Sequence, residues 1–316
     1  MTNQITNILG IQYPIFQGGM GNISDGCLAA AVSNAGALGT IGAGTLFVKE
    51  FTEKVKQMKS NTDLPCCVNI PISVHPEVKD IIKTVIEYQI PVVSLSAGNP
   101  KPYIPIFHEH GIKVICVTAS VHQAKKAEAA GADIIVCEGY EAAGLNSNLE
   151  TTTMTLVPQI VDAVDIPVAA AGGIADGRGL AAALALGAQG VQMGTRFIAT
   201  KEAPYHQVYK QKILDANDEA TTIVGRKFNR IRRIMKGGYA DELLKLEQHD
   251  KGLTEYLKQT NEDHHIIGAV KGNLEKGYIN SGQIAGLIQD LPTVEELISK
   301  MVADAKFILS KNIKKL

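Results

Sequence analysis

The stretch 127-AEAAGADIIVCEG-139 decides the fold, because it joins the end of a helix directly to the start of a buried strand. The alanine-rich part stops at a glycine, a residue that accepts the left-handed conformation found at many helix ends. The stretches 183-ALALGAQGVQMG-194 and 33-SNAGALGTIGAG-44 have the same form, and 109-EHGIKVICV-117 is a looser copy. The junction glycines are Gly36, Gly111, Gly131 and Gly187. Repeated junctions of this kind predict right-handed βαβ units and a parallel sheet.

Eight short apolar runs alternate with helical patterns along the first two thirds of the chain. The runs are residues 13–17, 38–42, 66–70, 92–96, 113–117, 133–137, 167–171 and 190–194. Eight is the number of strands that closes a (β/α)8 TIM barrel, so an α/β barrel is the expected fold. A doubly wound open sheet is the second expectation.

The pattern changes after the eighth run, because residues 202–277 are strongly charged and contain no convincing buried strand. We expect a small helical cap here, inserted after strand eight and supplying part of the substrate pocket. Residues 1–201 and 278–316 would then form the barrel. The cap contains a basic cluster, expected to be a solvated helix face or else a docking patch for an acidic partner or a phosphorylated cofactor. The cluster comprises Arg226, Arg230, Arg232, Arg233 and Lys236.

Composition excludes several classes of function. The chain has 316 residues, 45% of them apolar, with no Trp and a formal net charge of −1. This charge gives no reason to expect nucleic acid or an anionic membrane as a partner. Without an evident leader or membrane span, a cytoplasmic protein is expected. The five cysteines lack zinc-like spacing, so we expect core cysteines and no metal site.

The chemistry of such a barrel is expected in the loops that follow the strands. These loops are mostly glycine and small polar residues, which would let a large flat ligand approach the backbone. Gly172-Gly173 follows the seventh run, and Gly194-Thr195 ends the eighth. The loops after strands seven and eight form the usual phosphate site of this fold, and backbone N–H groups suit a phosphate. The sequence therefore predicts a phosphate-bearing cofactor.

Seven motifs together resemble the FMN-dependent family of nitronate monooxygenases and type II enoyl-acyl-carrier-protein reductases. The motifs are YPIFQGGM (13–20), VNI (68–70), EGYEAAG (138–144), TTTMTLVPQIV (151–161), AAAGGIADGRG (169–179), VQMGTRF (191–197) and SGQIAGLI (281–288). The resemblance implies FMN inside the barrel, with its phosphate on the loops after strands seven and eight. The chain length and modest insertion are closer to the enoyl reductase branch. The implied cofactor contacts are Gly18, Gly19, Met20, Asn69, Glu138, Ala143, Gly172, Gly173, Gln192, Gly194 and Thr195.

The sixth loop departs from the family pattern. The family commonly has Glu-Ala-Gly-Gly-His there, with the histidine over the flavin as acid or base. This chain has Leu145 in the histidine position. Leucine cannot donate or accept a proton, and general acid–base help is typically worth about 10²–10⁴-fold in rate. The catalytic residue is therefore unknown from sequence, with Asn146, Tyr140 and His75 as weak substitutes and His264-His265 in the cap as further histidines.

Four functions follow from these observations. The first is an FMN-dependent oxidoreductase in which NAD(P)H, binding transiently, provides the electrons that reduce an activated C=C bond of an enoyl-acyl substrate. The second is oxidation of alkyl nitronates with O2. The third is a flavin-binding protein without turnover, and the fourth is a lyase or isomerase barrel for a phosphorylated metabolite. The expected partner is a small-molecule or acyl-type substrate, with acyl carrier protein and a second copy of the chain, as a homodimer, as further candidates.

Overall fold

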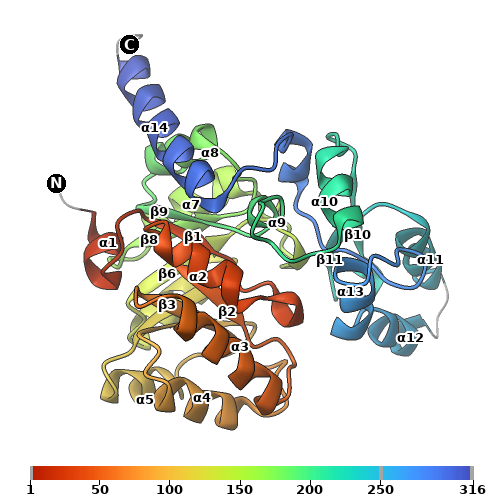
Figure 1. Ribbon diagram of the computed structural model, residues 1–316, viewed down its shortest axis with the longest axis horizontal. Helices are drawn as coiled ribbons and strands as arrows, with labels where there is room; N and C mark the ends of the chain where they lie inside the picture. Colours follow the sequence, from red (N-terminus) through yellow and green to blue (C-terminus); the bar gives the residue numbers. More distant parts are fainter. Residues whose placement is uncertain (1–2, 249–251, 314–316) are drawn as a thin grey trace.

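The eight expected strands form a TIM barrel in the computed structural model, which describes residues 3–248 and 252–313 (Figure 1). The parallel strands follow the order β1-β9-β8-β6-β5-β4-β3-β2. A parallel bridge joins Phe16 of β1 to Leu38, directly before β2, so the sheet closes on itself. An open doubly wound sheet is thereby excluded. The strands are β1 (Ile15–Gln17), β2 (Gly39–Gly42), β3 (Cys66–Pro71), β4 (Val92–Ser96), β5 (Lys113–Thr118), β6 (Ile134–Glu138), β8 (Val168–Ala171) and β9 (Gly190–Met193).

Helices cover the outside of the barrel and one of its ends. The covering helices are α2 (Gly26–Asn34), α3 (Val48–Asn61), α4 (Val78–Glu87), α5 (Ile104–Glu109), α6 (Val121–Ala129), α7 (Thr153–Val161), α8 (Gly177–Ala185) and α14 (Val294–Ile313). The first helix, α1 (Gln4–Leu9), places Ile5 and Leu9 in the cluster that fills the barrel interior. The four junction glycines have φ between 71° and 98°, which confirms the left-handed turns expected from the repeat.

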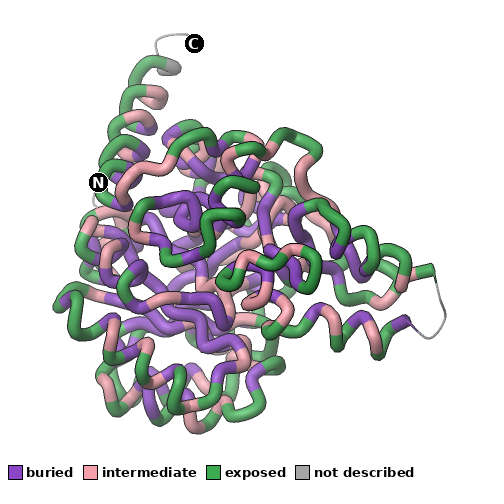
Figure 2. The backbone as a smooth tube through the Cα atoms, turned by 45° about the vertical axis from the view of Figure 1, so that its right-hand side comes forward, coloured by how far each residue is buried: buried purple, intermediate pink, exposed green. Residues whose placement is uncertain are grey.

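Two apolar layers stabilise the barrel, one inside it and one between its strands and helices. The inner layer includes Phe16, Leu38, Cys67 and Ile134, all 1% exposed or less. The purple tube in Figure 2 follows these strands through the middle of the molecule. Of the five cysteines, four are buried, as expected, and Cys27 is exposed. Burial raises the pKa of the Cys66 thiol to about 11, which suits packing rather than thiolate chemistry.

The described part of the cap contains four α-helices, but the expectation that it lacks buried strands was wrong. Its helices are α10 (Gln207–Leu214), α11 (Gly238–Leu246), α12 (Gly252–Gln259) and α13 (Glu262–Ala269). An antiparallel hairpin of β10 (Thr221–Val224) and β11 (Arg232–Met235) pairs with β7 (Gly144–Leu145) from the sixth barrel loop. Two adjacent arginines open β11, so its sequence lacked the apolar run that identified the barrel strands.

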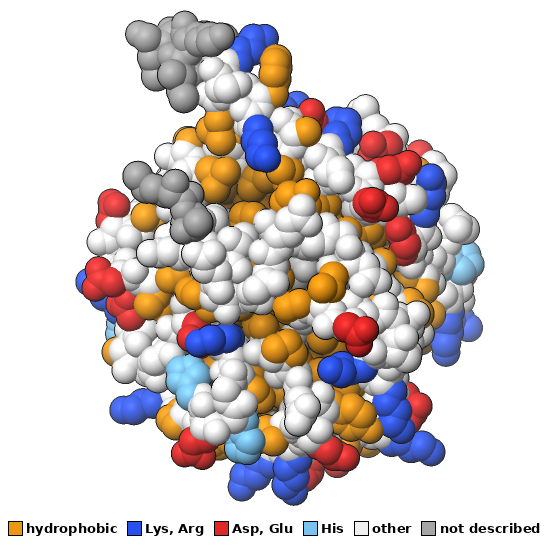
Figure 3. Space-filling view, turned by 60° about the vertical axis from the view of Figure 1, so that its left-hand side comes forward, with side chains coloured by type: hydrophobic (Ala, Val, Ile, Leu, Met, Phe, Trp, Pro, Cys, Tyr) orange, Lys and Arg blue, Asp and Glu red, His pale blue; other side chains and the backbone are white. Residues whose placement is uncertain are grey.

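The basic cluster is consequently not a helix face. Arg232 and Arg233 lie on β11 and are 6% and 3% exposed, whereas Arg226 and Lys236 are exposed. Figure 3 shows a face of the molecule on which acidic and basic side chains alternate without a large patch of one sign. The buried arginines must therefore be explained by what surrounds them.

The cap has a small apolar core of its own, built around Ile234, Leu243, Tyr256 and Tyr278. In Figure 1 it lies beside the barrel, in cyan and blue. The boundary at residues 202 and 277 stays a prediction. Within the described ranges, no helix combines the length and apolarity needed to cross a membrane.

Candidate active site

One large cavity of about 1450 Å³ opens at the carboxyl ends of the barrel strands. Drug-sized ligands typically occupy pockets of about 300–1,000 Å³, so this cavity has room for a cofactor and a second molecule. Every residue for which the sequence implied a cofactor contact lines it. These residues are Gly18, Gly19, Met20, Asn69, Glu138, Ala143, Gly172, Gly173, Gln192, Gly194 and Thr195. The structure thus brings the set together, while its role in cofactor binding stays a prediction.

The first loop follows β1 and runs flat against the cavity wall. Gly18 N–H donates to Met193 O at 2.8 Å, which fixes the loop to β9. A Cβ added to Gly19 would lie 2.6 Å from Asn69 Cβ, so only glycine fits there. The next residue, Met20, has a left-handed φ of 55°. This arrangement presents bare backbone to a ligand, as a flat ring system requires.

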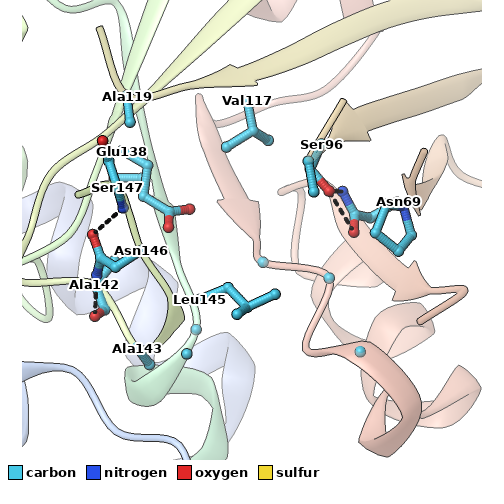
Figure 4. Close-up of a pocket in the computed structure, with 18 of the residues that line it drawn as sticks. Asn69, Ser96, Val117, Ala119, Glu138, Ala142, Ala143, Leu145, Asn146 and Ser147 are labelled. Atoms are coloured by element: carbon cyan, nitrogen blue, oxygen red, sulfur yellow. Dashed lines mark hydrogen bonds between the residues drawn. The ribbon is translucent and has the colours of Figure 1, made fainter. Parts of the chain in front are cut away.

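Asn69 is held in place by its neighbours on β4. Its Nδ2 donates to Ser94 O and to Ser96 Oγ, each at 3.2 Å. Figure 4 shows Asn69 and Ser96 on one side of the cavity and Glu138 and Asn146 on the other. A fixed amide on one wall can recognise the polar edge of a ring without losing side-chain freedom on binding.

The loops after β8 and β9 form a cradle with open space in front of it. Gly172 and Gly173 have φ of 95° and 72°, conformations that favour glycine. A Cβ added to Gly194 would meet nothing within 4 Å, so this position faces empty space. Behind it, Gly282 N–H donates to Thr195 Oγ1 at 3.0 Å. Exposed backbone amides with open space in front of them suit a phosphate group.

Glu138 ends β6 and lines the cavity. Burial raises the pKa of its carboxyl from 4.5 to about 7. In Figure 4 the carboxyl points into the cavity. A carboxyl with this pKa can carry a proton near neutral pH.

The sixth loop places Leu145 in the cavity, as the sequence implied. Its side chain is 49% exposed and extends into the space between the cavity walls (Figure 4). Asn146, one of the weak catalytic candidates, also lines the cavity. However, its Nδ2 donates to Ala142 O at 3.0 Å and to Tyr140 O at 3.3 Å. Asn146 thus stabilises the loop that carries Leu145.

The other two weak candidates, Tyr140 and His75, do not line the cavity. The Tyr140 ring lies under the Arg233 guanidinium at 4.6 Å, and its hydroxyl contacts Arg226. His75 is buried, with Nε2 3.1 Å from Leu46 O and Nδ1 accepting from a backbone N–H. Burial lowers the pKa of His75. Neither side chain lines the cavity, and a catalytic role for either stays an untested prediction.

The cap adds a polar wall that the sequence did not reveal. We use "polar wall" for Arg232, Glu262, His265 and Asn280, which all line the cavity. Arg232 Nη1 donates to Asn280 Oδ1 at 3.2 Å, and His265 Nδ1 lies 3.7 Å from Glu262 Oε2. The cap histidines were visible in sequence, but nothing there indicated that the hairpin and α13 would bring His265 beside Arg232.

Glu262 connects this wall to the first barrel loop. Its Oε2 accepts a hydrogen bond from Asn22 N–H at 3.2 Å. Although burial alone would raise the pKa of this carboxyl, the contact with His265 and the charge of Arg232 lower it to about 2. Glu262 is therefore ionised at neutral pH and holds the cap against the loop that contains Gly19.

The glycine-lined cavity and the position of Leu145 can now be compared with known proteins. The family model for nitronate monooxygenase matches residues 2–304. The chain belongs to the nitronate monooxygenase family. It is, like the other members, an oxidoreductase, which excludes the lyase or isomerase barrel and the flavin-binding protein without turnover.

Two branches of this family are similar to the chain over nearly its whole length. The solved structure of FabK from Thermotoga maritima has a TM-score of 0.95 at 39% identity and covers 100% of both chains. A probable nitronate monooxygenase from Staphylococcus saprophyticus is 33% identical, over 98% of this chain and 99% of the relative. A (3aS,4S,5R,7aS)-5-hydroxy-7a-methyl-1-oxo-octahydro-1H-indene-4-carboxyl-CoA dehydrogenase from Rhodococcus jostii is 32% identical, over 95% of each.

Proposed function

We propose that the protein is an FMN-dependent oxidoreductase that uses NAD(P)H to reduce the activated C=C bond of an enoyl-acyl thioester. The observation that carries this proposal is the full-length similarity to FabK, an enoyl-acyl-carrier-protein reductase, at TM-score 0.95. The relative named as a carboxyl-CoA dehydrogenase supports a thioester substrate. Acyl carrier protein or coenzyme A would be the carrier of the acyl group.

The cavity residues fit FMN. Gly18 and Gly19 leave a flat wall without side chains for the ring, with the Asn69 amide beside it, and the cradle of Gly172, Gly173 and Gly194 leaves open space for a phosphate. Bound FMN would supply hydride transfer to the substrate. The protein's own part would be to orient the ring, exclude water and hold the thioester against it. No separate nucleotide-binding fingerprint is evident in the sequence, so NAD(P)H would bind transiently over the flavin.

Anaerobic half-reactions test the proposal. The purified protein should show the visible absorption of oxidised flavin, and heating should release FMN. NADH or NADPH should bleach this absorption, and crotonyl-pantetheine should restore it, whereas saturated butyryl-pantetheine should not. A colourless protein that takes up no added FMN would contradict the cofactor. A flavin that NAD(P)H reduces but no enoyl thioester reoxidises would contradict the substrate.

Oxidation of preformed alkyl nitronates with O2 is the second candidate. It is favoured by the relatives named as probable nitronate monooxygenases. Leu145 in the histidine position weakens it without excluding it, since a preformed nitronate needs no proton removed. Oxygen consumption with ethyl nitronate in the absence of NAD(P)H would support this candidate. The two candidates share the cofactor site and differ only in what reduces and reoxidises it.

A further inference from the structure

Arg232 is a buried cation with unused hydrogen-bond donors that faces the cavity. Its side chain belongs to a residue that is only 6% exposed, and it lines the cavity wall. Among the described residues, Asn280 Oδ1 is the one hydrogen-bond acceptor it reaches, and no carboxylate lies within ion-pair distance. Its guanidinium also lies 5.1 Å from the centre of the Tyr278 ring. A guanidinium has five N–H donors, and no Arg232 nitrogen is both fully enclosed and without a partner, so its remaining donors are accessible from the cavity.

Asn280 and His265 are fixed next to this guanidinium. The backbone oxygen of Asn280 accepts from the Tyr209 hydroxyl, and its Oδ1 accepts from Arg232. The remaining polar atom, Nδ2, lies 3.3 Å from His265 Nδ1. The His265 ring stacks on Tyr278 with centroids 5.3 Å apart and an angle of 8° between the planes. The polar wall is therefore rigid before any ligand binds.

The polar wall lies between the first and the sixth barrel loops. Arg232 is paired in register with Leu145, and Glu262 accepts a hydrogen bond from Asn22 N–H just after the first loop. A Cβ added to Gly144 would be 3.7 Å from the Asn280 amide. Charged groups thus occur beside the position where the family histidine is absent, on the part of the cavity that a substrate must enter.

We propose that Arg232 and Asn280 form an oxyanion subsite for the thioester carbonyl oxygen, and that His265 supplies the proton that completes reduction. This inference rests on the proposed function. Hydride addition at the β-carbon moves the C=C electron pair onto the carbonyl oxygen and forms an enolate. Arg232 and Asn280 N–H groups stabilise that charge, in the way of other preorganised oxyanion sites. The α-carbon then takes a proton from His265, which solvent reprotonates, and the saturated thioester is released.

The charges around His265 are consistent with this role. Glu262 on the same helix is an ionised carboxylate, Arg232 approaches from β11, and the Tyr278 ring covers one face. Leu145, in register with Arg232 across the β7–β11 pair, borders the same part of the cavity.

Arg232→Gln in the holoenzyme tests the subsite. We expect kcat/KM for crotonyl-pantetheine to fall about 10²–10³-fold, the usual loss when one oxyanion donor is removed. FMN content and the rate of flavin reduction by NAD(P)H should be unchanged. Lys236→Gln removes a charge from the same hairpin outside the cavity and should behave as wild type. Arg232→Lys should restore part of the rate. Wild-type kinetics in Arg232→Gln would overturn the proposal.

A binding measurement separates the two roles and does not depend on turnover. 4-Nitrophenolate is a planar oxyanion that cannot be reduced at a C=C bond, and its binding can be followed by the change in flavin absorption. Arg232→Gln should weaken its binding at least about tenfold, since charge-assisted hydrogen bonds are lost. His265→Gln should keep phenolate binding but lose about 10²-fold or more in turnover, with an altered solvent isotope effect.

The outcomes also separate this proposal from the proposed function. A wild-type holoenzyme that reduces no enoyl thioester contradicts the proposed function, whereas phenolate binding still tests the subsite. A wild-type holoenzyme without affinity for phenolate, or an Arg232→Gln variant with unchanged affinity, contradicts the subsite. Full turnover in His265→Gln contradicts the assignment of the proton donor.

Discussion

The barrel and the cap contribute to the same cavity in opposite ways. The barrel presents backbone, through glycines such as Gly19 and Gly194, along the wall formed by its first and last loops. The cap presents side chains, with Arg232, Glu262 and His265 converging from a strand and a helix. The difference indicates that the barrel and the cap have different roles in binding. A surface of bare backbone suits a cofactor common to a whole family, whereas charged side chains suit a particular substrate.

The largest effect is expected from changing the barrel part of the cavity. Gly194→Glu should abolish FMN binding, because a carboxylate would project into the open space of the cradle and repel a phosphate. Gly194→Ala is the matched control and should retain FMN, since a Cβ there meets nothing within 4 Å. Flavin content after purification, measured by absorption and by heat release, checks both. Normal flavin content in Gly194→Glu would place the phosphate elsewhere.

Cavity-creating substitutions in the two cores should separate the stabilities of the two regions. Leu243→Ala removes a fully buried side chain from the cap core, and Leu28→Ala removes one from the barrel core. Such changes typically cost about 2–5 kcal/mol. Leu243→Ala should loosen the cap, lowering turnover while flavin stays bound. Leu28→Ala should lower the denaturation midpoint of the barrel, as followed by the release of flavin. Loss of flavin in both variants would show that the regions unfold together.

Restoring the family histidine at Leu145 tests the place where the sixth barrel loop meets the cap. Leu145→His should raise oxidation of a neutral nitroalkane by at least about 10²-fold, the usual worth of a general base. Oxidation of the preformed nitronate should change little, because no proton must be removed. Oxygen consumption with the two forms of nitroethane measures the effect. Efficient oxidation of the neutral form by the wild-type protein would mean that another residue already serves as the base.

The smallest effect concerns Glu138 and pH. The folded pKa of about 7 lies above the ordinary value of 4.5, so the folded state holds the proton more tightly than the unfolded state. Stability should therefore fall as pH rises from about 4.5 to about 7, by at most about 3.5 kcal/mol at about 1.4 kcal/mol per pKa unit. Glu138→Gln should remove this slope. Denaturation of the two cofactor-free proteins at pH 5 and pH 8 provides the comparison. An equal loss of stability between these pH values in both proteins would exclude Glu138 as its cause.

Sequence patterns predicted the barrel more fully than the cap for a physical reason. Parallel strands are buried on both faces, so each appears as a short apolar run that ends near the observed strand, as at β6 and β9. The hairpin strand β11 is buried too, but two of its four residues are arginines, whose hydrogen-bond partners are Tyr140 O and Thr221 for Arg233 and Asn280 for Arg232. When a buried charge is paired with residues that are distant in the chain, the strand that carries it shows no apolar run in the sequence.

The site was predictable to the same uneven extent. Glycine loops after strands can be recognised from a short stretch of sequence. Each expected cofactor contact from Gly18 to Thr195 lines the cavity. The polar wall depends on residues from β11, α13 and the segment before η3 (Gln283–Leu287) meeting in space. His75 follows a strand too but does not line the cavity, because a position after a strand does not show whether a side chain turns toward the barrel mouth.

The pairing of β7 with β11 links the sixth barrel loop to the cap as one small sheet. A hinge movement that opened the cap for a bulky acyl carrier would displace Leu145 together with Arg232, because hydrogen bonds join their strands. Entry of substrate and the shape of the pocket beside the ring would then change in a single step. The two-residue strand β7 thus makes this loop part of any gate at the cavity mouth, and product escape would proceed at the rate at which the shared sheet moves.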